Sequence, residues 1–174
     1  MAERYSFYSK RLKLRHVIPS DYSFILNWEN DKENWLHSGV KSAYTVNEIK
    51  QYVSKSESLL VDGQTRFIVE LNSGKVIGCV DLFAFESEVE EASVGILILP
   101  EERRKGYGGE TLNSIVSIAA KTYHLKQLKA LILQENKLSQ NLFEKVGFIN
   151  QLTKTNWYHY NGSAYRQLTY LKKI

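Results

Sequence analysis

The feature that most constrains the fold of this chain is an apolar segment, residues 92–99, that leads through a glycine-rich basic turn into a long helical pattern. Apart from one serine and one glycine, all residues of this segment are apolar. Such a nearly continuous apolar run is typical of a strand buried on both faces of a sheet. The turn, residues 100–110, contains three glycines, which let the backbone bend tightly and approach a ligand closely. The pattern therefore predicts a buried strand, a tight turn and a helix from Gly106 to about Tyr123, whose apolar face is Leu112, Ile115, Val116, Ala119 and Tyr123.

The segments around this unit predict a mixed α/β fold. Alternation and apolar runs indicate six to seven strands, at residues 11–15, 66–71, 75–83, 92–99, 128–133, from 148 onward and at 165–171. About four helices are predicted, beginning at Pro19, at the capping box from Thr45 to Glu48, at Gly106 and near Leu138, the last ending at Gly147.

Length and composition bound the class of protein. The 174 residues are enough for one domain and not for two, so residues 1–174 are expected to form a single domain. No apolar run reaches the roughly 18 residues of a membrane-spanning helix, and residues 1–6 contain no apolar signal core. Cys79 is the single cysteine, which excludes an internal disulfide and favours a cytoplasmic location. Its apolar neighbours predict a core residue rather than a nucleophile.

Charge and histidine spacing exclude two further classes. The net charge is +4, but acidic residues interrupt the positive ones, so no nucleic-acid surface is predicted. An anionic cofactor would explain the excess as well as solvated lysines do. No metal site is predicted, because none of the four histidines has a metal-ligand spacing to cysteine, histidine or carboxylate: His16, His37, His124 and His159.

The basic turn can hold a phosphate, because free N–H groups and the dipole at a helix start favour an anion. Arg103, Arg104 and Lys105 add positive charge beside it. A P-loop string is absent, and a Rossmann fingerprint fails at Thr111, where its third glycine should stand. These observations predict a diphosphate site, the alternative being a solvated basic turn.

Two motifs together resemble the GNAT acetyltransferases. The string Arg103-x-x-Gly106-x-Gly108 is similar to that family's Arg/Gln-x-x-Gly-x-Gly/Ala signature, and residues 136–148 resemble its second signature, Asn-x-x-Ala/Ser-x-x-Leu-Tyr-Glu-Lys-x-Gly-Phe. Residues 12–15 and 28–31 are similar to the RimJ/RimL and spermidine-acetyltransferase branches. The resemblance covers residues 11–171 and implies a twisted, mostly antiparallel sheet and acetyl-CoA as co-substrate.

The resemblance also implies the residues that bind acetyl-CoA. The strand at residues 96–98 would pair with the pantetheine arm as an added strand does, and the turn would supply amides to the diphosphate. Asn136 would bind the pantetheine side, the alternative being a plain helix N-cap. The expected coenzyme-binding residues are Ile96, Leu97, Ile98, Arg103, Arg104, Lys105, Gly106, Tyr107, Gly108, Gly109, Asn136, Ser139 and Phe143.

The catalytic positions depart from the family pattern. The family's tyrosine, which protonates the departing thiolate, is replaced by Phe143, and a glutamate common in its central strand is replaced by Ser93. The general acid and base are therefore unknown. Positioning and oxyanion donors can carry much of the rate, and a thiol with a pKa near 8.5 leaves fairly well unaided.

The acceptor side is expected between the first two helices. Carboxylates and indoles gather there, and they suit a cationic amine by charge and cation–π contact; the alternative is a polar helix end with two core indoles. The residues are Trp28, Glu29, Asp31, Glu33 and Trp35. We therefore expect an N-acetyltransferase acting on a small polyamine or diamine. A protein N-terminus and a coenzyme-binding module without catalysis are the alternatives, and a homodimer is left open.

Overall fold

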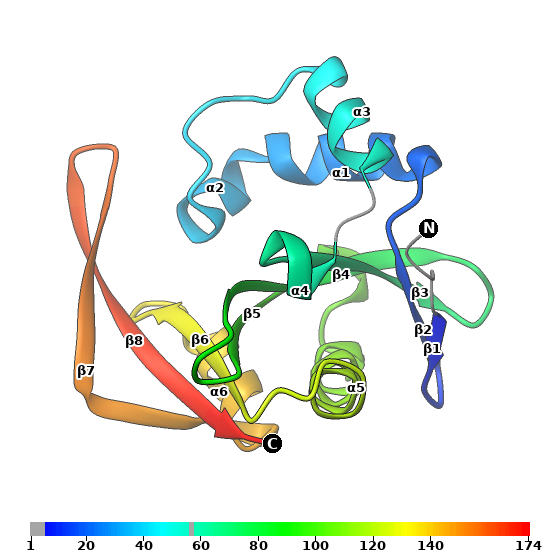
Figure 1. Cartoon of the computed structure of the whole chain (residues 1–174). Coiled ribbons are helices and arrows are strands. Elements are labelled where there is room, and N and C mark those ends of the chain that lie inside the picture. The colour runs from blue at the N-terminus through cyan, green and yellow to red at the C-terminus, as the bar shows by residue number, and fades with distance from the viewer. Residues whose placement is uncertain (1–5, 56–57) are drawn as a thin grey trace.

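The computed structural model describes residues 6–55 and 58–174 as one twisted sheet with helices on both faces (Figure 1). The eight strands of these residues follow the order β1-β2-β3-β4-β5-β6-β8-β7, and only the β5–β6 pair is parallel. This confirms a mostly antiparallel mixed α/β fold. The strands are β1 (Ser6–Tyr8), β2 (Leu12–His16), β3 (Thr65–Leu71), β4 (Val76–Glu86), β5 (Glu91–Ile98), β6 (Gln127–Leu133), β7 (Ile149–Tyr160) and β8 (Ser163–Lys173).

The helices divide between the two faces of the sheet. Figure 1 shows α1, α2 and α3 above the sheet and α5 below it. The helices are α1 (Tyr22–Asn30), α2 (Lys32–Ser38), α3 (Val46–Ser54), α4 (Leu59–Asp62), α5 (Tyr107–Lys121) and α6 (Lys137–Lys145), with 3-10 turns η1 (Pro19–Asp21) and η2 (Pro100–Glu102). No helix among the described residues is long and apolar enough to cross a membrane.

Each face has its own apolar core. On the α1–α3 face, Ile25 and Ile49 pack with Ile68 of β3 and with Cys79. On the other face a larger cluster joins the stripe of α5 to the sheet and to Phe143 of α6. Cys79 is 5% exposed, which confirms it as a core residue.

Local signals place the helix ends as the sequence predicts. The Thr45 side chain accepts a hydrogen bond from the Glu48 amide at 3.3 Å, and Glu48 Oε2 accepts one from the Thr45 amide at 2.7 Å. These two bonds form the predicted capping box of α3. Gly147, at φ +91°, follows α6 in the left-handed conformation that glycine tolerates.

The predicted count of six to seven strands and about four helices is too low, since the described residues hold eight strands and six α-helices. Strand β1 is only three residues long, too short for alternation to be visible. Helix α2 carries two apolar residues in its seven, and α4 is a single turn. Residues 1–5, which bear on the expected absence of a signal segment, lie outside the described residues.

The parallel strands β5 and β6 separate soon after their pairing begins. Strands β5 and β6 pair only from Glu91 with Gln127 to Ser93 with Lys129. Beyond this point β5 stays paired with β4 on its other edge as far as Ile98. The edge of β5 that faces β6 is therefore left without a neighbouring strand.

Candidate active site

A groove of about 2010 Å³ runs from this split to the α1–α3 face of the sheet. Pockets for a single small molecule usually occupy about 300–1,000 Å³, so this groove has room for two reactants. One part is lined by β5, β6, the basic turn and α6, and the other by α1, α2, α3, β3, β4 and β8.

The β5 wall offers backbone groups to the groove. The Leu99 amide donates to Ile77 O at 2.9 Å, on the β4 side. Since alternate residues of a strand direct their backbone groups to opposite edges, Ile96 and Ile98 face the open edge. The carbonyl of Ile98 already accepts a bond from Arg103 Nε at 2.8 Å. All three residues expected on this wall, Ile96, Leu97 and Ile98, line the groove, but the backbone of Leu97 faces β4.

The basic turn ends with free donors at the start of α5. Gly106 adopts φ +85° as the N-cap, and the first backbone bond of the helix runs from Glu110 N to Gly106 O. The amides of Tyr107, Gly108 and Gly109 therefore precede the helical ladder, as at any helix N-terminus. A Cβ built on Gly109 would meet nothing within 4 Å, whereas one on Gly108 would lie 3.1 Å from Leu142.

Most of the expected residues of the turn border the groove, and two do not. Arg103, Arg104, Gly106, Gly108 and Gly109 are among the lining residues. Lys105 instead directs its ammonium to Glu102 Oε2 at 2.9 Å. The Tyr107 ring packs under the guanidinium of Arg11, 4.7 Å from the ring centroid. The amides, glycines and two arginines fit a diphosphate.

Helix α6 contributes Asn136, Ser139 and Phe143 to the lining. Asn136 Oδ1 caps the helix by accepting from the Ser139 amide at 3.0 Å. This bond leaves the Asn136 Nδ2 donors available to a ligand. Phe143 is 3% exposed and packs edge-on against Phe148, with ring centroids 5.0 Å apart.

The two altered catalytic positions supply no proton-transfer group to the groove. Phe143 has no hydroxyl, and Ser93 is 3% exposed and does not line the groove.

Burial raises the pKa of Cys79 to about 12, so its thiol stays protonated and is no nucleophile at neutral pH.

The part of the groove lined by α1, α2, α3, β3, β4 and β8 is the expected acceptor end. Three of the five residues expected there line the groove. Trp28, Glu29 and Glu33 line the groove, whereas Asp31 and Trp35 do not. Asp31 Oδ1 caps α2 by accepting from the Glu33 amide at 3.0 Å. Trp35 Nε1 donates to Glu29 O at 2.7 Å, which ties α2 to α1.

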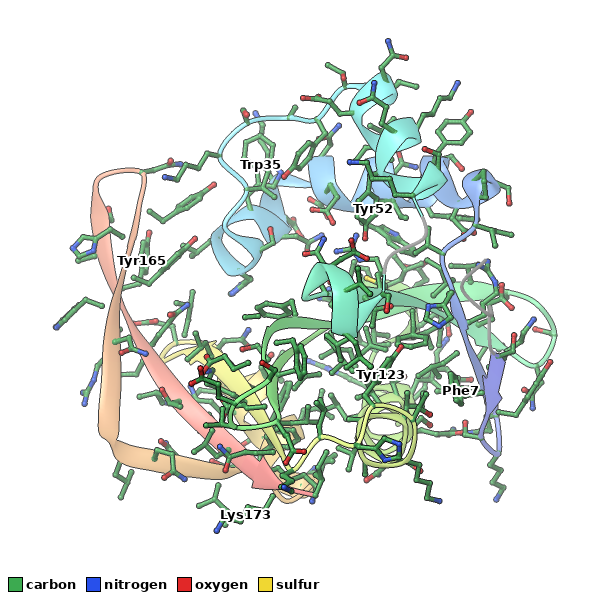
Figure 2. The ribbon with its side chains drawn as sticks, viewed as in Figure 1. Phe7, Trp35, Tyr52, Tyr123, Tyr165 and Lys173 are labelled. Atoms are coloured by element: carbon green, nitrogen blue, oxygen red, sulfur yellow. The ribbon has the colours of Figure 1, made fainter. Side chains whose placement is uncertain are left out.

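Several acceptor-end residues escape sequence reasoning because they come from distant strands and helices. Figure 2 shows Tyr165 directed from β8 towards α2, and Tyr52 between α3 and the sheet. No local motif marks these positions, although their residue types match those of the expected site. The additional acidic and aromatic lining residues are Tyr44, Glu48, Tyr52, Asp81, Phe83 and Tyr165.

Arg66 organises the carboxylates at this end. Its Nη1 lies 2.7 Å from Glu29 Oε1, and its Nε and Nη2 bind the two oxygens of Asp81 at 2.7 and 2.8 Å. Burial opposes the charge of this guanidinium, but Asp81, together with Cys79 and Tyr52, raises its pKa well above the ordinary value. Arg66 therefore holds both carboxylates in fixed positions beside the groove.

His37, in the last turn of α2, is the only one of the four histidines to line the groove within the described residues. Burial, and then the positive charge of Arg103, lowers its pKa below 6.5. Its imidazole is therefore neutral at pH 7 and able to accept a proton.

Among the described residues, no three or more His, Cys, Asp or Glu side chains form a group that could hold a metal ion.

The groove has room for the two reactants that a group-transfer enzyme brings together. Comparison with known proteins identifies the kind of transfer: a family model described as an acetyltransferase (GNAT) domain matches residues 11–149. The chain belongs to the GNAT acetyltransferase family. It is an N-acetyltransferase, and acetyl-CoA is its co-substrate.

Two related proteins match most of the chain at 23% sequence identity. The uncharacterized N-acetyltransferase YoaA of Bacillus subtilis is 23% identical over 157 residues, 89% of each chain. The spermidine N(1)-acetyltransferase of Vibrio cholerae is 23% identical over 143 residues, 82% of each chain.

Solved structures with the same fold include two from Vibrio cholerae. That of Vibrio cholerae spermidine N-acetyltransferase, in complex with CoA and spermine, has a TM-score of 0.84 at 21% identity and covers 95% of this chain and 96% of its own. A putative ribosomal-protein-serine acetyltransferase from Vibrio cholerae has a TM-score of 0.76 at 21% identity and covers 98% of each chain.

Proposed function

We propose that this chain, as one acetyltransferase domain spanning residues 1–174, transfers the acetyl group of acetyl-CoA to a primary amine of a small polycation, of the polyamine or diamine class. The observation that carries the proposal is the charge of the acceptor end. Four carboxylates line it, and Arg66 binds two of them, Glu29 and Asp81. The four are Glu29, Glu33, Glu48 and Asp81.

The carboxylates differ in how much of their charge a ligand can use. Arg66 satisfies part of Glu29 and both oxygens of Asp81. Glu48 Oε2 accepts from both the amide and the hydroxyl of Thr45. The side chain of Glu33 has no ion-pair partner among the described residues, so it is the strongest candidate to bind a distal ammonium group.

The aromatic lining supports the same class of acceptor. Trp28, Tyr44 and Tyr165 border the acceptor end together with the carboxylates. An alkyl ammonium gains from cation–π contact with such rings, and its methylene chain packs on them. A neutral acceptor would leave the carboxylates without this compensation.

The transfer step needs a proton to leave the amine, since a free alkylammonium has a pKa near 10.4. In the proposed step the neutral imidazole of His37 takes one proton from the ammonium group, directly or through one water molecule. The freed amine nitrogen then attacks the thioester carbonyl; the C–N bond forms, the C–S bond breaks, and the nitrogen loses its second proton to water. The thiolate departs without a tyrosine and takes a proton from solvent.

The coenzyme part of the proposal assigns the diphosphate to the turn. Arg103, Arg104 and the glycines at 106, 108 and 109 supply charge and free amides there. The backbone of Ile96 pairs with the pantetheine arm along the open edge of β5, with Asn136 Nδ2 on the opposite wall.

Thiol release from acetyl-CoA, measured with spermidine, putrescine and a peptide beginning with alanine or serine, tests the function. We expect release with the polyamines and little with the peptide. Release with the peptide alone would replace the small amine by a protein N-terminus. Coenzyme binding without release to any acceptor would leave a binding module.

A matched pair of variants tests the acidic end. Glu33→Gln should raise the KM for spermidine by about three- to tenfold, because one charge-assisted contact is lost. Glu88→Gln, an exposed change outside the groove, should leave it unchanged. Equal KM values for the two variants would contradict a role for Glu33.

A further inference from the structure

The turn between β1 and β2 braces the basic turn from the side away from the groove. Glu110 Oε1, in the first turn of α5, accepts from Ser9 Oγ and from the Arg11 amide, both at 2.7 Å. Its Oε2 accepts from Arg11 Nε at 2.7 Å. Neither Arg11 nor Glu110 lines the groove, so these bonds do not belong to the ligand-facing surface.

The guanidinium of Arg11 also touches the turn itself. Its Nη1 donates to Lys105 O at 3.0 Å, and its carbon lies 4.7 Å from the centroid of the Tyr107 ring. A Cβ built on Gly106 would stand 3.2 Å from Arg11 Nη2. One side chain therefore contacts Lys105 and Tyr107 of the turn, leaves little room for a side chain at Gly106 between them and, through Glu110, contacts the helix that follows.

The bond to Lys105 O has a consequence for the groove. In a trans peptide the C=O and the following N–H point in opposite directions. Because Arg11 holds the carbonyl of Lys105 on the outer side, the N–H of Gly106 is directed inward. Gly106 is a lining residue, so this amide faces the position assigned to the diphosphate.

Arg11 also removes an electrostatic conflict. A carboxylate in the first turn favours the helix but repels an anion bound at the same terminus. Burial raises the pKa of Glu110, yet the hydrogen bonds from Ser9 and Arg11 outweigh it and hold that pKa below its ordinary value. Glu110 therefore stays ionised, with its charge compensated on the side away from the groove.

We propose that Arg11 is a positioning residue for acetyl-CoA: by binding Glu110 and the carbonyl of Lys105, it holds the turn in the shape that presents the Gly106 amide to the diphosphate. The inference rests on the assignment of residues 103–109 to the diphosphate under the proposed function. Arg11 touches the turn and not the coenzyme, so its effect is on coenzyme affinity and not on the acceptor.

Isothermal titration calorimetry with CoA, on the whole chain, measures this effect without turnover. Arg11→Ala should weaken CoA binding by about three- to tenfold, the effect of one or two lost charge-assisted bonds. Arg11→Lys, which keeps the charge beside Glu110 but not the planar fork, should give a smaller loss. The KM for acetyl-CoA should rise in step, while the KM for the amine stays constant.

Arg15→Lys is the matched control. Arg15, on β2, binds Asp21 and Glu70 at 2.6 to 2.8 Å and has no contact with the turn. Its replacement should lower the melting temperature and leave CoA affinity unchanged. If Arg11→Ala does not fold, Arg11→Lys and Ser9→Ala provide the same comparison.

Three outcomes would overturn the proposal. CoA affinity that is the same in wild type and Arg11 variants would show that the turn keeps its shape without Arg11. Equal losses in the Arg11 and Arg15 variants would reduce Arg11 to a contributor to stability. A wild-type chain that does not bind CoA would refute the assignment of the turn itself, and so would end the proposed function together with this inference.

Discussion

Tyr160 donates its hydroxyl hydrogen to the carbonyl oxygen of Val40 at 2.8 Å, and both residues are buried. This bond joins the far end of the β7–β8 hairpin to the loop between α2 and α3. Figure 1 shows the hairpin rising beside the sheet to the level of α2. Because α2 and β8 both line the acceptor end, the bond holds its two walls together.

Tyr160→Phe should therefore affect both stability and acceptor binding. Loss of the bond leaves a buried carbonyl without a partner, which costs about 1–2 kcal/mol of unfolding free energy. Urea denaturation measures this loss, and we expect the KM for the amine to rise while that for acetyl-CoA stays unchanged. Tyr8→Phe, at a tyrosine 72% exposed, is the control for removing a hydroxyl. An unaltered amine KM would argue that the walls keep their spacing without this bond.

Gly109→Ala should separate stability from coenzyme affinity. Alanine is favoured over glycine in a helix by about 1 kcal/mol, and the added Cβ would meet nothing within 4 Å. We expect a higher melting temperature together with weaker CoA binding, since the methyl group enters the space assigned to the diphosphate. Calorimetry and thermal denaturation on the same preparation provide both values. A variant that is more stable and binds CoA as before would place the diphosphate elsewhere.

Phe143→Tyr restores the hydroxyl that the family pattern has at this position. A positioned general acid contributes roughly 10²- to 10⁴-fold when proton transfer limits the rate. If protonation of the thiolate limits turnover, we expect kcat with a good acceptor to rise by about 10²-fold, the low end of that range. Stopped-assay thiol release provides kcat, and Phe148→Tyr, the ring packed against Phe143, serves as a control. A flat result would mean that protonation of the thiolate lies outside the slow step.

The pH dependence of the rate tests His37. Its pKa is lowered by burial and then by Arg103, so the neutral form that accepts a proton persists below pH 6.5. We expect kcat/KM to stay level through neutral pH and to fall only as the pH drops through this lowered pKa. His37→Gln should remove that acidic limb along with much of the rate. His159→Gln, on β7 and outside the groove, should keep the wild-type profile; a profile unchanged in His37→Gln would exclude this base.

The strand–turn–helix unit assigned to the acetyl donor could be predicted from the sequence because it is local. The buried strand, the turn and the helix after it lie within residues 92–121, so one stretch of residues both signals and builds the structure. Two residues of that stretch still behave differently from expectation. Lys105 and Tyr107 turn away from the groove because Glu102 and Arg11 bind them there, and neither partner is visible in a motif.

The acceptor side could be predicted only in part, because it is assembled over long sequence separations. Glu29 lies in a segment with readable composition, but its partner Arg66 is 37 positions away, on β3. Tyr165 reaches the groove from β8, which only the strand order of the sheet brings there. Periodicity reveals which residues are buried in an element, but not which elements become neighbours.

The short pairing of β5 with β6 also has a mechanical meaning. Within residues 6–55 and 58–174, three residue pairs, from Glu91 with Gln127 to Ser93 with Lys129, form the only ladder between the first five strands and the last three. The two parts of the sheet, β1–β5 and β6–β8, are therefore joined by a short ladder, while residues of α5 and α6 pack in a core cluster that contains residues of both parts. A ligand that bonds to the free edge of β5 while touching β6 would connect the two parts a second time. The acetyl donor would then be part of what keeps this enzyme rigid while it works.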